Sequence, residues 1–412
     1  MTTSGRSRAL LTAIVVSFLA ACGTATAPAV PGPTIANDDA GEATSRPAAR
    51  VTATSASTGS PTSSTTTTTP STTATPSTAT PSTTTTTTTP STTTTIAAVD
   101  ELAPLDPAFT QLNALFDGLA ANNLGAAMSV THRGEIFVER AAGPTVGGSA
   151  ATASSPMVVA SVSKLITSLA VGRLATIGAV DLDAPMPWEA MGLPAQPAWL
   201  DVTPRELLQH SAGMPVARAD WFVWGGGTCR QFLPTLLVGP PTDTRGEWEY
   251  SNGNYCALGL LIEHITGQPA ADAIDGIVFT PLGLEGVHST ETGLRDTDLA
   301  HPRPVDRLTR LGAAGTFVVS MNDLAIALSR LSDDDLVHLR QPAAYTDQYG
   351  VGHTGTIRGA KACAWSLGDG ATALSIAISG DSIYSGGQLC DLAIPALARD
   401  LGIPDPEPRR FP

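Results

Sequence analysis

The stretch Ser161-Val162-Ser163-Lys164 begins a strong helical pattern that continues to Gly178. Apolar residues recur at helical spacing through this segment, and Gly178 is placed to end it. Ser161 and Lys164 are three residues apart, so they share one face of the predicted helix. A serine hydroxyl is a weak nucleophile and needs a nearby base or cation, which a lysine one turn away can supply. The helix N-terminus adds N–H groups and a partial positive charge where an oxyanion would form.

A second motif, Tyr250-Ser251-Asn252, precedes an apolar helical pattern that runs from Tyr255 to Gly267. In a cationic site a tyrosine can lose its proton and act as a base, and an asparagine can hold a substrate amide. An ordinary turn with a helix cap explains this tripeptide as well. In the same way, an N-cap serine and a solvated lysine explain the first motif taken alone.

A third motif is His353-Thr354-Gly355-Thr356, followed closely by Arg358. Gly355 would let a substrate backbone approach a strand edge closely, because glycine has no side chain to keep it away. Two ordinary interpretations compete with this one, namely a surface histidine at 353 and a solvated charge at 358.

Together the three motifs resemble, in order and spacing, the S-x-x-K, Y-x-N and K/H-T-G elements of the serine β-lactamase and DD-peptidase superfamily. More narrowly, they are similar to those of the secreted actinomycete D-alanyl-D-alanine carboxypeptidases. Class C β-lactamases and related esterases share most of the pattern. The run LLQHSAG (207–213) resembles a conserved turn of the family, in which we expect His210 to be structural and to hold its turn by hydrogen bonds. The resemblance covers about residues 106–402.

The resemblance implies a role for each matching residue. Ser161 would attack a carbonyl and form an acyl-enzyme, and Lys164 would lower the barrier to removing its proton. Tyr250 would act as general base and then protonate the leaving group. The N–H groups of Ser161 and Thr356 would form the oxyanion hole. The residues expected to contact the substrate are Asn252, His353, Thr354, Gly355, Thr356 and Arg358. The family chemistry implies no metal and no cofactor.

Two features bear on the substrate. His353 stands where many relatives have lysine, and an unperturbed histidine is mostly neutral at pH 7, so it would hold a carboxylate less firmly. Arg358 is then the candidate for a second carboxylate holder. Between the first two motifs, Trp221-Phe222-Val223-Trp224 precedes the glycine run Gly225–Gly227, which suits a cleft rim or lid. Packing under a loop is the alternative for these aromatic residues.

The order of predicted elements indicates an α+β fold. Strands are expected near both ends of the globular part and helices in its middle, as in a mainly antiparallel sheet flanked by helices. The resemblance adds a mostly helical subdomain, with the active site between the two parts. The predicted helices cover 109–122, 162–178, 255–267 and 388–401, with further helices after Thr203 and Ser320; the predicted strands cover 126–131, 135–140, 362–366 and 372–379.

The N-terminus has the pattern of a bacterial lipoprotein signal peptide over residues 1–21. Arg6 and Arg8 precede a short apolar stretch at 10–19, which is too short for a stable membrane span. The run that ends in Cys22 resembles a lipobox, so Cys22 is the predicted lipidation site and the predicted attachment to the bilayer. A plain signal peptide with an incidental cysteine is the alternative.

Composition divides the rest of the chain into three parts. Residues 22–104 are rich in Thr, Ser, Pro and Ala, a composition that cannot bury enough apolar surface to fold, and they are predicted to form a disordered spacer. Residues 105–405 form the predicted hydrolase domain, and residues 406–412 form a tail.

Four cysteines fall in the hydrolase domain: Cys229, Cys256, Cys363 and Cys390. Disulfides are expected in an exported protein, and four cysteines allow three pairings. We favour Cys229–Cys256 and Cys363–Cys390, because each pair is close in sequence and would join one local unit. The absence of a C-x-x-C spacing argues against zinc.

The net charge of −14 argues against nucleic-acid binding, which needs clustered basic residues. The expected partners are a small-molecule or peptide substrate and the lipid bilayer, and no protein partner is evident. The sequence therefore predicts a serine hydrolase on the outer face of the cell membrane, with D-alanyl-D-alanine carboxypeptidase or β-lactamase-like activity. The alternatives are an esterase for small or lipid-derived esters and a non-catalytic penicillin-binding-like module.

Overall fold

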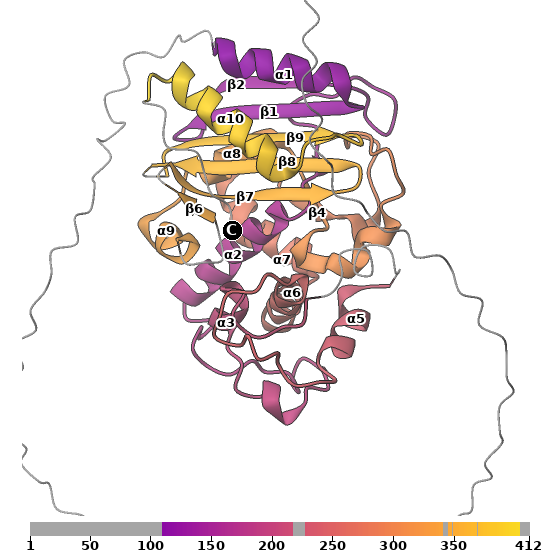
Figure 1. The fold of residues 1–412 in the computed structure, drawn as a ribbon, viewed down its shortest axis with the longest axis vertical. Helices are drawn as coiled ribbons and strands as arrows, with labels where there is room; N and C mark the ends of the chain where they lie inside the picture. Colours follow the sequence, from indigo (N-terminus) through magenta and orange to yellow (C-terminus); the bar gives the residue numbers. More distant parts are fainter. Residues whose placement is uncertain (1–108, 217–226, 341–344, 348, 369, 404–412) are drawn as a thin grey trace, which may run out of the picture. The chain divides into compact units, whose positions relative to one another are not determined.

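A six-stranded antiparallel sheet organises the structure, a computed structural model that describes residues 109–216, 227–340, 345–347, 349–368 and 370–403. The strand order is β2-β1-β9-β8-β7-β6 (Figure 1). The strands are β1 Gly125–His132, β2 Glu135–Ala142, β6 Tyr345–Asp347, β7 Gly350–Ile357, β8 Ala360–Leu367 and β9 Thr372–Ser379. A second sheet, β3-β5-β4, consists of Met157–Val158, Phe317–Val319 and Val287–Ser289.

Several predictions concern residues outside the described ranges. They are the signal peptide over 1–21, lipidation of Cys22, the spacer over 22–104, the aromatic and glycine residues 221–226 of the predicted lid, and the tail over 406–412.

The two ends of the domain meet in the sheet. Strand β1 pairs with β9 from Gly125↔Ser379 to His132↔Thr372, so the C-terminal segment completes the sheet as predicted. The predicted hairpin is β1–β2, and both residues of its turn, Arg133 (φ 51°) and Gly134 (φ 82°), are left-handed. This conformation matches the twist of the flanking strands, and glycine adopts it without strain.

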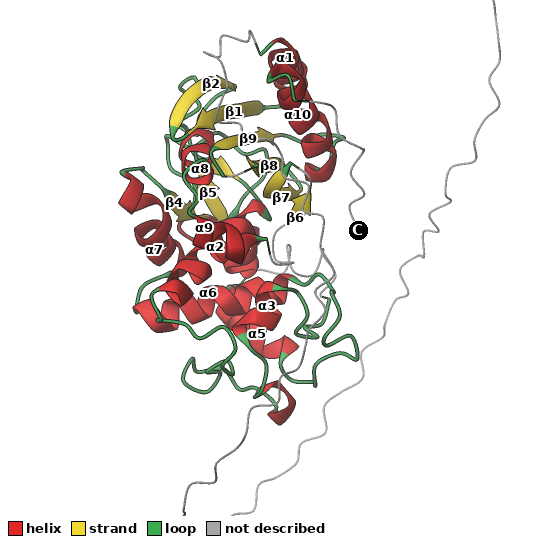
Figure 2. Cartoon of the chain, turned by 90° about the vertical axis from the view of Figure 1, so that its left-hand side faces the viewer, coloured by secondary structure: helices red, strands yellow, loops and turns green. Residues whose placement is uncertain are grey.

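Helices α1 (Thr110–Asn122) and α10 (Gly386–Asp400) cover one face of the sheet (Figures 1 and 2). Their apolar side chains form one buried cluster with residues of β1, β8 and β9. The Cys363–Cys390 disulfide joins β8 to α10, as predicted. The Asp400 carboxylate accepts hydrogen bonds from the N–H groups of Gln111 and Leu112, so it links the last residue of α10 to the first turn of α1.

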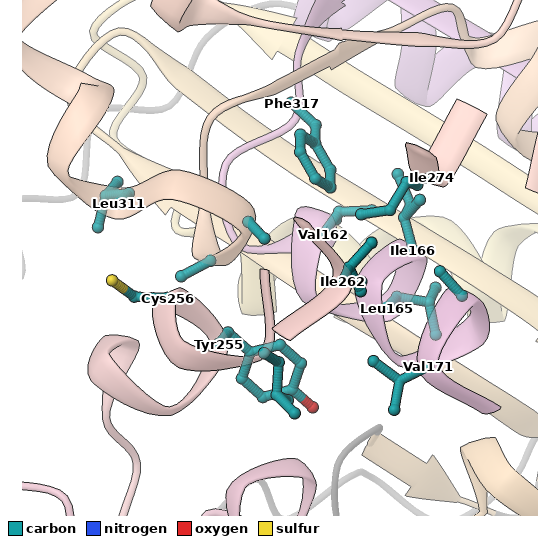
Figure 3. Packing of buried hydrophobic residues seen from close by; sticks show 14 of the residues in the cluster. Val162, Leu165, Ile166, Val171, Tyr255, Cys256, Ile262, Ile274, Leu311 and Phe317 are labelled. Carbon is teal, nitrogen blue, oxygen red and sulfur yellow. The ribbon is translucent and has the colours of Figure 1, made fainter. Parts of the chain in front are cut away.

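Helices α2 (Val162–Thr176) and α8 (Met321–Leu328) lie against the other face, and the helical part continues beyond α2 (Figure 1). Figure 3 shows Val162 and Ile166 of α2 in one cluster with Ile262 of α6 (Asn252–Thr266). The predicted Cys229–Cys256 disulfide joins α5 (Cys229–Leu236) to α6. The remaining helical segments are α3 Pro204–Leu208, α5 Cys229–Leu236, α6 Asn252–Thr266, α7 Ala270–Ile274, α9 Asp333–Leu339, η2 Pro197–Trp199, η3 Asp275–Phe279, η4 Thr280–Leu282, η5 Thr290–Thr292 and η6 Asp306–Ala314.

The α+β class is confirmed, and so are the predicted helix starts at Thr203 and Ser320. Thr203 forms a capping box with Glu206, and the Ser320 hydroxyl accepts the Asp323 N–H. Helix α6 begins at Asn252, three residues before the predicted start, because Ser251 caps it. Within the described ranges, no helix has the length and apolar character that crossing a bilayer requires.

Candidate active site

Ser161 stands at the N-cap of α2, the helix that lies between the sheet and the rest of the helical part (Figure 1). Its hydroxyl makes no capping hydrogen bond, so the interpretation that this side chain only caps the helix is wrong. The preceding residue, Ala160, is left-handed with φ 50°. A non-glycine residue in this conformation is strained and persists only where its surroundings fix it, which is common beside functional groups.

Lys164 is fully buried one turn after Ser161, so the interpretation as a solvated lysine is also wrong. Its Nζ donates to Asn252 Oδ1 and to the carbonyl oxygen of Ala314, both at 2.7 Å, and lies 3.3 Å from Ser161 Oγ. Burial disfavours the charged amine and lowers the pKa of Lys164 well below its usual 10.5.

The Tyr250 hydroxyl reaches the same serine from the segment before α6. It donates to Ser161 Oγ at 3.1 Å, and Lys164 Nζ lies 4.9 Å from the centre of the Tyr250 ring. A hydroxyl, an amine and a phenol from two distant stretches of sequence therefore converge on one point. Asn252, in the first turn of α6, completes the group through its Oδ1, which accepts from Lys164.

The third motif lies on β7 beside this group. Strand β6 pairs with β7 only at Gly350–Gly352, so the part of β7 from His353 onward extends beyond that pairing. His353 is 2% exposed, which excludes a surface histidine, and its Nδ1 lies 2.6 Å from the carbonyl oxygen of Thr354. Burial, helped by the nearby Lys164, lowers the pKa of His353 from 6.5 to about 3. His353 is therefore neutral and offers no positive charge to a carboxylate.

Gly355 has a packing role that its motif did not indicate. A Cβ at this position would overlap the carbonyl oxygen of Val159, two residues before Ser161. The missing side chain thus lets β7 pack against the segment that carries the nucleophile, whereas the sequence had suggested close approach of a substrate. Thr356 is exposed, and its Oγ1 accepts the N–H of Gly386 at 2.7 Å. Thr354 is half-buried.

Arg358 lies just beyond β7, in an exposed position near Asp381. The Arg303 guanidinium pairs with Asp381 at 2.6 Å and is the main cause of the lowered pKa of that carboxyl, to which Arg358 and Lys361 also contribute. The positive charge of Arg358 is therefore partly matched by an acid.

The sequence analysis missed the carbonyl of Ala314, because a backbone group leaves no motif. A weak signal does exist in the run Gly312-Ala313-Ala314-Gly315, where small residues allow close packing. A Cβ added at Gly259 of α6 would press on Ala313, and the Thr167 hydroxyl of α2 donates to the Ala313 carbonyl at 2.9 Å. The described residues contain no cluster of His, Cys, Asp and Glu that could hold a metal ion.

Comparison with known proteins agrees with this geometry. A family model described as Beta-lactamase matches residues 112–389. Esterase EstB of Burkholderia gladioli is 33% identical over 221 residues, which amount to 46% of this chain and 54% of EstB. The chain thus spans about half the length of this curated relative.

Two solved structures have a similar fold. A D-stereospecific amidohydrolase from Streptomyces sp. has a TM-score of 0.55 and 22% identity, covering 71% of this chain and 98% of that one. The D-amino acid amidase from Ochrobactrum anthropi SV3 has a TM-score of 0.58 and 21% identity, covering 71% of this chain and 99% of that one. At this level of identity the two structures establish the fold.

Proposed function

Since the chain belongs to the Beta-lactamase family, we propose that it is a serine acyl hydrolase that acts through an acyl-enzyme on Ser161. One observation carries this proposal: Ser161 Oγ lies 3.1 Å from the Tyr250 hydroxyl and 3.3 Å from Lys164 Nζ. A nucleophile within reach of two proton-transfer groups is the arrangement that covalent catalysis requires.

The surroundings of Lys164 make it the base for the first step. Two of its hydrogen-bond partners, Asn252 Oδ1 and the Ala314 carbonyl, are acceptors and occupy two N–H groups. A neutral amine has only two N–H groups, so its lone pair is left to face Ser161. The lowered pKa of Lys164 favours this neutral form. The amine then takes the hydroxyl proton as Ser161 Oγ forms its bond to the substrate carbonyl carbon.

The carbonyl electrons move to oxygen in this step, and the N–H groups of Ser161 and Thr356 would stabilise the oxyanion. When the intermediate collapses, the bond to the leaving alcohol or amine breaks, and Tyr250 donates its proton to that group. Lys164 returns the proton it took, which restores the phenol. Water then attacks the acyl-enzyme by the same steps in reverse, and the acid is released. Asn252 Nδ2 would hold the acyl side of the substrate, since Oδ1 is occupied by Lys164.

Esters and amides are the proposed substrates. EstB is named an esterase and two proteins of similar fold are named for amide hydrolysis, and these names support the proposal. The neutral His353 adds support. A substrate whose leaving group carries no negative charge does not need a fixed cation beside β7. The test is a panel of a short p-nitrophenyl ester, a D-amino acid amide, a D-Ala-D-Ala peptide and nitrocefin, with wild type and Ser161→Ala. Ester or amide turnover that disappears in Ser161→Ala supports the proposal.

A second candidate is a D-alanyl-D-alanine carboxypeptidase of the actinomycete type, or a β-lactamase. The His353-Thr354-Gly355-Thr356 motif favours it, since hydroxyls at 354 and 356 with Arg358 nearby suit a terminal carboxylate. Turnover of the peptide or nitrocefin without turnover of the ester and the amide would select this candidate. A non-catalytic module is the remaining alternative, and covalent labelling of Ser161 by a fluorophosphonate would exclude it.

We further propose that the protein is exported and anchored to the outer face of the membrane through acylated Cys22. The two disulfides support export, because such bonds persist in oxidising compartments. Wild type is then expected in the detergent phase of a membrane extract, and Cys22→Ala in the aqueous phase. The same distribution for both proteins would refute the anchor.

A further inference from the structure

His210 follows α3 and has a left-handed backbone, with φ 54°. Its side chain is 2% exposed. A residue other than glycine is uncommon in this conformation, although histidine is among those that adopt it more often, and the surrounding structure maintains it. The contacts that maintain it reach well beyond its own turn, since its ring nitrogen bonds to residues 41 and 44 positions later in the chain.

These contacts involve both chain neighbours of Tyr250 and the Tyr250 ring itself. The carbonyl of His210 accepts the N–H of Glu249 at 2.8 Å, and its Nδ1 accepts the N–H of Ser251 at 3.2 Å. Between these two anchors, the imidazole packs against the Tyr250 ring, with centroids 4.6 Å apart and planes at 34°. His210 therefore fixes the backbone before and after Tyr250 as well as the ring itself.

The segment that leads to Tyr250 depends on such anchors, because Gly246, Glu247 and Trp248 are exposed. The tautomer of His210 is also determined. Its Nδ1 accepts from Ser251 N–H and lies 2.9 Å from Asn254 Nδ2, so the single proton of the neutral ring is on Nε2. Burial is the main cause that lowers the pKa of His210 well below 6.5, and it keeps the ring neutral.

We propose that His210 is a positioning residue, which holds the Tyr250 hydroxyl at Ser161 for proton transfer. This inference rests on the proposed function. The Tyr250 hydroxyl must stay within hydrogen-bonding distance of Ser161 Oγ, now 3.1 Å, to serve in the reaction. A displacement of about 1 Å in a catalytic group can cost about 100-fold in rate.

The test is a double-mutant cycle on single-turnover acylation by an alkyl ester, whose leaving group needs the proton of Tyr250. His210→Asn retains an acceptor near Nδ1 and tolerates a positive φ, but removes the ring. We expect it to lower the acylation rate about 10- to 100-fold and to change KM less than threefold. In a Tyr250→Phe background the same substitution should change the rate less than threefold, because the group that it positions is already gone.

His288→Asn is the matched control. His288 is also buried, at 5% exposure, and its Nε2 bonds to Asp298 rather than to Tyr250 or its neighbours. It should lower thermal stability but leave the acylation rate within threefold. If His210→Asn does not fold, His210→Phe, which retains a ring, replaces it in the cycle.

Two outcomes overturn the inference and they are distinguishable. Additive rate losses in the cycle, or a folded His210 variant with wild-type acylation, refute the positioning role while the acyl-enzyme stands. Absence of any acyl-enzyme in wild type refutes the proposed function itself.

Discussion

Lys164 Nζ lies 2.7 Å from the carbonyl oxygen of Ala314, a residue 150 positions later in the chain. The hydrogen bond from Nζ to Asn252 Oδ1 is equally short. Together the two bonds direct the remaining position of the amine toward Ser161 Oγ, which lies 3.3 Å from Nζ. The proposed role of Lys164 as base rests on this geometry together with its burial.

Lys164→Arg should lower the rate of acylation about 10²- to 10⁴-fold at pH 7. A guanidinium stays protonated and cannot accept the serine proton, and general bases typically contribute a factor of this size. Stopped-flow acylation with a p-nitrophenyl ester measures it. The matched control is Lys361→Arg, at the other lysine of the chain, which donates to the Ile357 carbonyl and should retain activity within about threefold.

Acylation by wild type should also fall as pH decreases. The pKa of Lys164 is lowered but finite, so acid converts the amine to a form that cannot act as a base. Because Lys164 and Tyr250 contact the same hydroxyl, the apparent pKa values belong to the group as a whole. An acylation rate that is constant from pH 5 to 9 would contradict the assignment.

Tyr250→Phe should slow the hydrolysis of poor leaving groups most strongly. Tyr250 is proposed to protonate the departing group, and an alkyl alcohol or an amine needs that proton more than p-nitrophenolate does. We expect a loss of about 10²- to 10⁴-fold for alkyl esters or amides and a clearly smaller loss for p-nitrophenyl esters. Equal losses for both kinds of substrate would show that Tyr250 acts only on the attack by Ser161.

His353 should make the fold sensitive to acid. Its pKa is about 3 in the folded protein and about 6.5 in the unfolded chain, so between these values the unfolded chain holds a proton that the folded protein lacks. The free energy of unfolding therefore falls as pH decreases below 6.5, by about 1.4 kcal/mol per pH unit from this group. Urea unfolding at pH 7 and pH 5 should show a loss about 2 kcal/mol smaller in His353→Asn than in wild type. The same loss in both proteins would contradict the buried, neutral state of His353.

Gly355→Ala should displace Ser161, although the added methyl group lies on β7 and not on the segment that carries Ser161. The new Cβ would overlap the Val159 carbonyl, so the segment before Ser161 must shift. We expect a loss of about 1–3 kcal/mol in stability and at least about a tenfold loss in acylation rate. Gly118→Ala on α1 is the control, since its Cβ would meet nothing within 4 Å. It should stabilise the protein by about 0.5–1 kcal/mol without affecting activity.

The sequence allowed the α+β class, most helices and strands, both disulfides and the meeting of Ser161, Lys164 and Tyr250 to be predicted. Ser161, Lys164 and Tyr250 could be identified because each lies in a short motif whose residue types and spacing resemble those of the family. The burial of His353 and the packing use of Gly355 could not be predicted, because both depend on what lies opposite β7 after folding. The start of α6 was misjudged because Asn252, Gly253 and Asn254 have the composition of a turn, whereas Ser251 caps the helix and Asn252 contacts Lys164.

The acyl-enzyme on Ser161 can be detected from the intact mass of the protein after brief exposure to an activated ester. We expect an adduct with the mass of the acyl group, located on Ser161 by peptide mapping, absent from Ser161→Ala and slow to form in Lys164→Arg. An adduct on another residue, or turnover by Ser161→Ala at the wild-type rate, would contradict this expectation.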